Sequence, residues 1–493
     1  MTERPQSAWL QVAGVALALC GSALFLFAVW DSTLNHDIEW YLTSTRRWLE
    51  GGRLYIDIVE INPPLNFYLT VPPLFLSDLT GLTESNAQFV VFSGILLISL
   101  WWSSQILLRS KMLSPPRLLL FQLGLWVFVI VTALPSLGQR DHLFIIFALP
   151  WLIGHLVAPL PTGNPVPRAA WASIGICLKP HFILLPVFVT LWQIWRQRSW
   201  RPVIDRSNLL FLGVGLAYIA AVWRLYPEYF EAVVPLGLQT YGAYGFEPEK
   251  VLMRRGWLVP LITATGLLLA ARAKHRPDGF GLWITATLAG LSTYLVQWTG
   301  FYYQTAPLMA LSGLALFWVV TAQPAWTIGK GVCLLGGLLV LLQSAAFGLY
   351  RNPVVPDLAE HLGARDSLVV YSDYVHAGPP LARSTGAIWA SRYPAIWPLP
   401  GALNRLSQLD CQREEKECAR LERIRDQVRG EMIEDLVQFA PDTVVMDPLP
   451  GYIDGPKFDW MRFLEQDPRF RSEFAKYELE FSTKRFDVYR RQR

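Results

Sequence analysis

Two adjoining stretches near the start of the chain decide the fold: an apolar run at 9–30, WLQVAGVALALCGSALFLFAVW, and an acidic, aromatic segment at 35–41, NHDIEWY. The apolar run is long enough to cross the hydrocarbon core of a bilayer as a helix. It differs from a secretory signal peptide because few charges precede it, its apolar part is long, and no clear cleavage site follows. We therefore expect a retained membrane anchor with carboxylates directly behind it at the membrane surface.

The composition indicates a membrane protein that also carries a soluble part. Of the 493 residues, 52% are hydrophobic and 17% are charged. This is too apolar for a soluble protein of this size and too charged for one that lies wholly in the membrane. We expect a membrane domain at 1–350 and a soluble domain at 351–493. The net charge of +4 is small and spread over loops, which indicates no nucleic-acid partner.

Apolar stretches predict about eleven transmembrane helices. With a cytoplasmic N-terminus, lysines and arginines concentrate in the inside loops, which satisfies the positive-inside rule. An odd number of spans then places the first loop (31–86), the loop at 226–255 and the C-terminal domain on the outer face. The expected spans are 9–30, 87–108, 118–134, 142–159, 169–178, 182–195, 208–225, 256–271, 280–296, 304–320 and 331–349.

The segment at 62–79 is apolar but is not counted as a span. It contains Pro63, Pro64, Pro72 and Pro73, and proline interrupts the hydrogen-bond ladder that a spanning helix needs. We expect helices that lie at the membrane interface.

The C-terminal region is predicted to form a small α/β domain. Strand-like runs occupy 367–372, 443–446 and 486–489, and helical patterns cover 405–439 and 458–477. An aromatic and polar stretch in this region either binds a glycan or contacts the membrane part. Its members are Tyr374, His376, Arg392, Tyr393 and Trp397.

The chain has five cysteines. Cys20, Cys177 and Cys333 lie in apolar stretches and are expected to be inert packing residues. Cys411 and Cys418 lie in the predicted outer domain, where an oxidising compartment permits a disulfide. On one continuous helix their Cα atoms would be about 10.5 Å apart, which is too far for a bond. A disulfide therefore requires a break in the helix between them, and the sequence leaves both outcomes open.

Asp37 is the leading candidate for a catalytic residue. It closely follows the first span, and histidine, acidic and aromatic residues surround it rather than lysines. A carboxylate at the membrane surface, where a lipid-borne substrate presents its headgroup, can take a proton from an incoming hydroxyl, as glycosyl transfer requires. An ordinary polar loop is the alternative explanation, and it suits Glu39 and Asp57 equally well. The substrate-binding candidates of this segment are Glu39, Tyr41, Tyr55, Asp57, Glu60 and Asn62.

A second cluster, Arg140-Asp141-His142, lies between two predicted spans. Ionisable side chains at this depth are costly unless they are paired or bind something. One explanation is that Arg140 and Asp141 neutralise each other. The other is that Asp141, with His142 beside it, coordinates a divalent cation such as Mg²⁺ or Mn²⁺, or orients a phosphate with help from Arg140. The two explanations are compatible.

A third group of candidates is basic. Lys179 and His181 interrupt an apolar stretch, and a lysine there needs an anionic partner such as a phosphate, or must reach the interface with its amino group. Arg254 and Arg255 precede a span on the predicted outer face, against the positive-inside trend. They bind either a substrate phosphate or lipid headgroups.

The loop at 297–304, QWTGFYYQ, is polar and aromatic between two apolar runs. Anchoring at the membrane interface is the default role of such aromatic residues. The alternative is that Tyr302, Tyr303 and Gln304 contact a sugar or a polyprenyl chain. No sequence pattern of a Walker loop, a zinc site or a serine nucleophile elbow is present.

Over roughly residues 10–350 the chain resembles the GT-C superfamily of integral-membrane glycosyltransferases, in particular the bacterial mannosyl and aminoarabinose transferases that use polyprenyl-phosphate sugars. The resemblance rests on the order of several short motifs. These are Asp37 after the first helix, Gly51-Gly52-x-Leu54-Tyr55-x-Asp57 with Asn62-Pro63-Pro64, Arg140-Asp141 and Lys179-Pro180.

The resemblance implies a GT-C fold in the inner membrane of a bacterium and inverting sugar transfer at its outer face. The donor would be a polyprenyl-phosphate sugar, and the acceptor a glycan, lipid or protein of the cell envelope. Asp37 would be the catalytic base, and Asp141 would match the family's second acidic loop. Lys179, Arg254 or Arg255 would neutralise the leaving phosphate. The family's Tyr-His pair is Tyr303-Gln304 here, a departure from the pattern.

Two other classes of protein compete with a transferase. One is a flippase or other transporter of lipid-linked sugars, which also needs charged residues at membrane depth. The absence of an inverted repeat in the sequence counts against it, as does the grouping of the candidate residues on one face. The other is a ligase or polymerase that uses a diphosphate-linked glycan, for which an arginine-rich outer loop is expected.

Overall fold

The computed structural model divides the chain into two compact units. The first unit comprises 1–34, 71–220 and 246–350, and the second comprises 35–70, 221–245 and 351–493. The domain boundary expected near Arg351 thus coincides with the last point at which the chain passes from the first unit to the second. The described residues are 4–157, 163–245, 247–249, 251–252, 258–272, 277–323 and 325–492.

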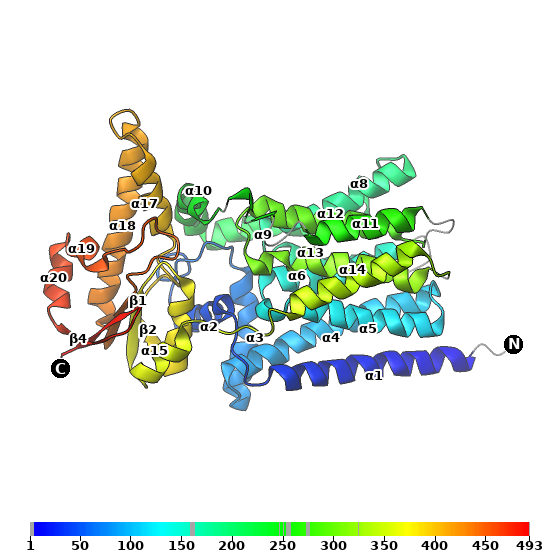
Figure 1. The fold of residues 1–493 in the computed structure, drawn as a ribbon, viewed down its shortest axis with the longest axis horizontal. Coiled ribbons are helices and arrows are strands. Elements are labelled where there is room, and N and C mark those ends of the chain that lie inside the picture. Colours follow the sequence, from blue (N-terminus) through cyan, green and yellow to red (C-terminus); the bar gives the residue numbers. More distant parts are fainter. Residues whose placement is uncertain are drawn as a thin grey trace. The chain divides into compact units, whose positions relative to one another are not determined.

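The first unit is built of helices (Figure 1). Helix α13 lies in its core, because nearly all of its side chains are buried. The helices are α1 (Arg4–Val29), α4 (Glu84–Ser110), α5 (Pro115–Val131), α6 (Arg140–Leu156), α7 (Val166–Ile176), α8 (Leu184–Gln197), α9 (Arg206–Leu225), α11 (Leu258–Ala271), α12 (Phe280–Gln297), α13 (Ala306–Ala322) and α14 (Ile328–Ala345). Helix α9 continues into the second unit, as does α3 (Leu65–Thr80).

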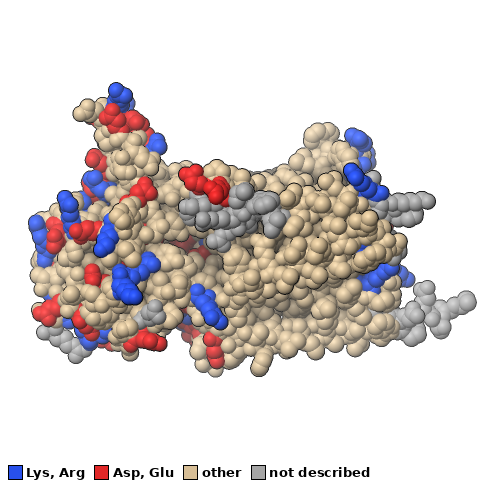
Figure 2. Space-filling view, viewed as in Figure 1, with Lys and Arg blue, Asp and Glu red and all other residues tan. Residues whose placement is uncertain are grey.

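Several of these helices turn apolar side chains outward. Phe27 of α1 is 85% exposed and Leu212 of α9 is 60% exposed. Such exposure of apolar side chains is unfavourable in water, and an apolar solvent such as the lipid of a membrane removes this free-energy cost. Figure 2 shows that the visible surface of this unit is almost free of charge, and that lysines and arginines gather at the end where α1 begins. Together these features identify the chain as a membrane protein.

Each of the eleven predicted apolar stretches is helical, with the bounds shifted by a few residues. Five described helical segments are long and apolar enough to cross a membrane, and α5 and α11 are shorter apolar helices. Helix α7 has 11 residues, which at about 1.5 Å per residue do not cross a bilayer alone. The number of spans therefore stays a prediction. Residues 65–80 form one helix that continues through Pro72 and Pro73, rather than several.

The second unit contains a five-stranded sheet with the order β2-β1-β3-β5-β4. Strand β1 (Ser367–Tyr371) pairs in parallel with β2 (Ile388–Trp389) and with β3 (Thr443–Met446). Strand β5 (Asp487–Arg491) pairs antiparallel with β3 and with β4 (Tyr477–Ser482). β1 and β3 are almost wholly buried, as expected for parallel strands covered on both faces.

Helices and short helical turns surround this sheet. The longest, α18 (Glu415–Phe439), buries apolar residues three or four positions apart, including Leu421, Val428 and Met432. The other elements are α2 (His36–Leu49), a π-helical turn at Tyr229–Val233, α10 (Val234–Thr240), a 3₁₀ turn at Tyr241–Tyr244, α15 (Val355–Leu362), α16 (Pro379–Thr385), α17 (Pro398–Gln408), α19 (Trp460–Leu464) and α20 (Pro468–Phe474).

The predicted helix at 405–439 is wrong as one element. The chain forms α17 and α18 with a turn between them, in which Asp410 accepts hydrogen bonds from the backbone amides of Gln412 and Arg413. This break brings the Cα atoms of Cys411 and Cys418 to 5.6 Å, and the two residues form a disulfide. The helix break that a disulfide between these two cysteines requires is therefore present.

The predicted helix at 458–477 is also wrong as one element. Asp467 caps a new helix by accepting from the amide of Arg469, and Pro468 cannot continue the preceding helix. Tyr477 then begins strand β4. The strands β1, β3 and β5 are confirmed close to their predicted bounds, whereas β2 and β4 were not predicted.

The disulfide gives a direct test of this part of the fold. In denaturant without reductant, the full-length protein should take up a thiol label at Cys20, Cys177 and Cys333 only. After reduction, Cys411 and Cys418 should also be labelled. Intact-mass spectrometry distinguishes the two states, and labelling of all five cysteines before reduction would contradict the disulfide.

Candidate active site

Asp37 lies in the first turn of α2, and the local sequence explains why the helix begins there. The side chain of Asn35 accepts a hydrogen bond from the amide of Asp37 at 3.0 Å and caps the helix. A carboxylate in the first turn is stabilised by the positive end of the helix dipole. The Asp37 side chain is 22% exposed, so it is held in place and still reachable.

Within the second unit, Asp37 lies beside His36, and ring contacts lead from His36 to His376 and Tyr374. His36 Nε2 lies 3.3 Å from Asp37 Oδ1, and the His36 and His376 rings are 4.1 Å apart. The ring of Tyr374 lies 4.5 Å from His376. Burial, together with the charge of His36, lowers the pKa of His376 to about 3, so this ring is neutral near pH 7. The neutral His376 ring can accept or donate a hydrogen bond, and it does not act as a positively charged partner of Asp37.

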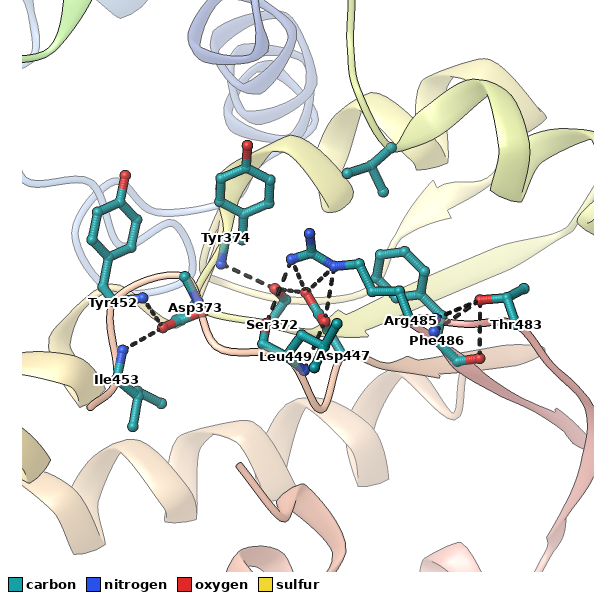
Figure 3. A network of polar contacts seen from close by, with 12 residues as sticks. Ser372, Asp373, Tyr374, Asp447, Leu449, Tyr452, Ile453, Thr483, Arg485 and Phe486 are labelled. Atoms are coloured by element: carbon teal, nitrogen blue, oxygen red, sulfur yellow. Dashed lines mark hydrogen bonds and ion pairs between the residues drawn. The ribbon is translucent and has the colours of Figure 1, made fainter. Parts of the chain in front are cut away.

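The residues beside Asp37 come from one edge of the sheet. Strands β1 and β3 are parallel, so their carboxyl ends meet at this edge, and Tyr374 follows β1 while Asp447 follows β3. β5 runs the other way, so Arg485, which precedes it, reaches the same edge. Figure 3 shows these loops from close by.

A buried carboxylate organises this edge (Figure 3). Asp447 accepts from Arg485 Nε at 3.0 Å and from Arg485 Nη2 at 2.6 Å, and from Ser372 Oγ at 2.8 Å. The Arg485 guanidinium lies 4.9 Å from the centre of the Tyr374 ring. The network therefore fixes the loop that carries Tyr374 and His376.

A second carboxylate holds the neighbouring loop. Asp373 accepts from the backbone amides of Gly451 and Tyr452 at 2.7 Å and of Ile453 at 2.8 Å. Burial raises the pKa of the Tyr452 hydroxyl, which keeps it protonated. The loops at both strand ends are thus tied to each other by charge-assisted hydrogen bonds.

Tyr374 and His376 were predicted from the sequence as glycan-binding candidates, but not as neighbours of the Asp37 segment. Ser372, Asp447 and Arg485 were not predicted as site residues. Their position directly after or before buried strands is a usable signal, because ligands of open α/β sheets bind at the carboxyl ends of strands. That signal requires the parallel pairing of β1 with β3 to be known.

The other carboxylates predicted near Asp37 have structural partners. Glu39 forms a buried ion pair with Arg383 of α16. Glu60 accepts from Trp40 Nε1 at 2.8 Å and from the amide of Asn62 at 3.0 Å, and it also binds the Asn62 side chain. These contacts join α2 to the following loop and to the C-terminal part of the unit. Substrate contacts by these residues stay predictions.

Tyr41, Tyr55 and Asp57 differ in their surroundings. Tyr41 is buried, with its ring 5.1 Å from that of Phe67. Asp57 pairs with the exposed Arg53 at 3.1 Å, and these hydrogen bonds lower the pKa of the Asp57 carboxyl against the effect of burial. Tyr55 donates to the carbonyl of Asn62 at 2.9 Å.

Tyr55 also lines a cavity of about 440 Å³ in the second unit. A volume of this size suits a small ligand. Arg392 and Tyr393, two of the glycan-binding candidates, lie in its wall, together with Glu228, Glu231 and Glu431.

In the first unit, Asp141 and Lys179 form a buried ion pair. The Nζ of Lys179 lies 2.6 Å from Asp141 Oδ2 and 3.1 Å from Gln297 Oε1, and their side chains are 7% and 1% exposed for Lys179 and Asp141. The ammonium group also lies 4.9 Å from the centre of the Tyr303 ring. The sequence predicts that Lys179 needs an anionic partner, and the structure supplies Asp141.

The residues around Asp141 do not fit the predicted cation well. Lys179 occupies one oxygen of Asp141, and His142 Nδ1 accepts from the amide of Gly138 at 3.2 Å. Within the described residues, no group of three or more histidine, cysteine, aspartate or glutamate side chains could hold a metal ion. The roles of Asp141 and His142 as metal ligands stay predictions.

The remaining candidates of the first unit are mostly engaged in packing. Gln304 is buried and accepts from Thr299 Oγ1 at 2.7 Å. The ring of Tyr302 lies 4.2 Å from Phe347, and that of His181 lies 4.9 Å from Phe182. Arg140 is buried at the start of α6. Arg254 and Arg255 lie outside the described residues.

No family model matches the chain, and no curated protein matches it in sequence. Among solved structures, the chain is similar to that of ArnT from Cupriavidus metallidurans in the apo state. The two are 14% identical, the similarity covers 96% of this chain and 97% of that chain, and the TM-score is 0.41.

The buried pair of the first unit predicts a coupled loss of stability. Asp141→Asn and Lys179→Met should each lower the free energy of unfolding by about 3 kcal/mol, because each leaves a buried charge without its partner. The double variant should lose clearly less than the sum. Unfolding in detergent measures these values, with Asp57→Asn of the exposed pair as a control expected to change little. Additive losses would contradict the coupling.

His376 predicts that stability depends on pH. Its pKa falls from 6.5 to about 3 on folding, so between these pH values the unfolded chain binds a proton that the folded protein does not. This contribution is complete above the unfolded pKa and is lost as the pH falls toward the folded one. His376→Phe should therefore flatten the fall of the unfolding temperature at acid pH. His361→Phe, at an exposed histidine, is the control, and an equal slope in all three proteins would refute this origin.

Proposed function

We propose that the chain is a membrane glycosyltransferase that moves a sugar from a polyprenyl-phosphate donor to an acceptor of the cell envelope, with Asp37 as the general base. The acceptor is a glycan, a lipid or a protein. The proposal places the reaction at the outer face of the inner membrane of a bacterium, with the N-terminus in the cytoplasm and the second unit in the periplasm.

The observation that carries this proposal is the position of Asp37. The carboxylate is fixed in a helix first turn, partly exposed, and set beside His36 and the neutral His376. Glu39 and Glu60 of the same segment are engaged with Arg383 and Trp40. Asp37 is therefore the carboxylate of this segment best suited to accept a proton from a substrate.

The proposed reaction balances without a cofactor. The acceptor hydroxyl oxygen attacks the anomeric carbon from the side opposite the phosphate, and the bond between that carbon and the phosphate oxygen breaks. The phosphate leaves with the electron pair, and Asp37 takes the hydroxyl proton. The sugar inverts its configuration. Lys179, Arg140, Arg254 and Arg255 stay candidates for phosphate binding.

Asp37→Asn tests the proposed base. The amide keeps the shape and the helix cap but cannot accept the proton, so transfer should fall at least about 100-fold. The measurement is release of polyprenyl phosphate from a polyprenyl-phosphate sugar by the purified full-length protein. Asp426→Asn is the control, since Asp426 is an exposed carboxylate of the same unit that pairs with Arg425. Full activity of Asp37→Asn in a folded protein would overturn the assignment.

The same assay separates the competing classes. A flippase or transporter of lipid-linked sugars releases no polyprenyl phosphate, and moves the intact donor between leaflets of a vesicle. An O-antigen ligase or polymerase acts on a diphosphate-linked glycan and releases polyprenyl diphosphate. Only the proposed transferase releases the monophosphate in step with glycosylation of an acceptor.

A further inference from the structure

Arg485 is anchored in a way that leaves one nitrogen for a ligand. Its Nε and Nη2 are bound by the fully buried carboxylate of Asp447. Nη1 donates no hydrogen bond to any described residue, and in Figure 3 it points away from Asp447. The side chain is 30% exposed. A guanidinium fixed on one side and open on the other is preorganised to hold an anionic oxygen.

A series of side-chain contacts connects the same arginine with Asp37. Its guanidinium lies over the Tyr374 ring, the Tyr374 ring contacts His376, and the His376 ring contacts His36, which pairs with Asp37. Arg485 and Asp37 are thus the two ends of one series of contacts within the second unit.

Two other arginines of the second unit each pair with acidic side chains. Arg383 pairs with the buried Glu39, and Arg392 pairs with Asp435 and Glu434. In the first unit, a phosphate at Lys179 would have to displace Asp141. A phosphate at Arg485 displaces no hydrogen bond that Nη1 makes to a described residue.

Building on the proposed function, we propose that Arg485 binds the phosphate of the polyprenyl-phosphate donor through Nη1, while Asp447 holds the guanidinium in place. Arg485 is then a substrate-binding residue supplied by the C-terminal sheet. Because Asp447 already balances its charge, the binding depends on directed hydrogen bonds rather than on net charge. The chemistry recognised is a phosphate ester.

Binding measurements with the full-length protein test this role separately from turnover. The probe is a short polyprenyl phosphate in detergent, and the polyprenol of equal length is the control ligand. Arg485→Lys and Arg485→Gln should weaken binding of the phosphate about tenfold, the loss expected for a charge-assisted hydrogen bond. Binding of the polyprenol should not change. Arg490→Lys, at an exposed arginine of β5, should bind both ligands as the unchanged protein does.

Arg485→Lys keeps a cation for Asp447, so it is the decisive variant if Arg485→Gln does not fold. A measurement on the unchanged protein needs no variant at all: polyprenyl phosphate should protect Arg485 from modification by phenylglyoxal, as mass spectrometry detects. Unaltered affinity of the folded Arg485→Lys protein, or lack of protection, would overturn the proposal.

Two further arms identify the source of the phosphate. Inorganic phosphate should protect Arg485 only weakly, and vesicles of phosphatidylglycerol should not compete with the probe. Equal competition by phosphatidylglycerol would overturn the donor assignment in favour of a general lipid headgroup. Activity retained in Asp37→Asn would overturn the proposed base whatever the Arg485 variants show, so the two failures are distinguishable.

Discussion

The parallel pairing of β1 with β3 is the constraint on which the candidate site depends. Val369 lies opposite Val444 and Tyr371 opposite Met446, so the chain leaves both strands at one edge. The antiparallel β5 returns to that edge from the other side. Asp447 and Arg485 can therefore meet although they come from different loops, and the buried carboxylate obtains the cation that it requires. With β5 parallel, Arg485 would lie at the opposite edge.

Buried ion pairs have different consequences in the two units. Asp141 and Lys179 are both nearly inaccessible, and the lysine is further held by Gln297. Such a pair is costly to break and poorly placed to exchange its partner. Asp447 is equally buried, but the arginine that neutralises it is a planar fork with several donors and is partly exposed. The difference between a point cation and a fork makes Arg485 the better phosphate ligand.

The local elements that the sequence predicted correctly are those with strong local patterns. The apolar helices of the first unit and the strands β1 and β3 are continuous apolar runs, which local periodicity detects. Strand β4 was not predicted because most of its residues are exposed and charged residues alternate with apolar ones. Helix α2 was not predicted because its short amphipathic pattern follows directly after the much stronger apolar pattern of the first span. A helix break at Asp410 depends on a single turn-forming side chain.

The candidate site was predicted only in part because its contacts join distant segments. Asp37 was found from its position behind the first helix, which is a local feature. The contact of His36 with His376 and the approach of Arg485 to Tyr374 follow from sheet topology, for which one sequence gives no pairing information. Lys179 illustrates the same limit, since its need for an anion was evident but the anion could not be named.

Helix geometry explains why Asp37 and Glu39 have different surroundings although they are two residues apart. Successive residues of an α-helix are rotated by about 100°, so the two carboxylates point to nearly opposite sides. Glu39 faces the interior and binds Arg383, while Asp37 stays partly exposed beside a histidine. An arginine stabilises the charged form of a carboxylate at any physiological pH, whereas an imidazole can give up its proton. The carboxylate beside the histidine is thus the one that stays within reach of a substrate.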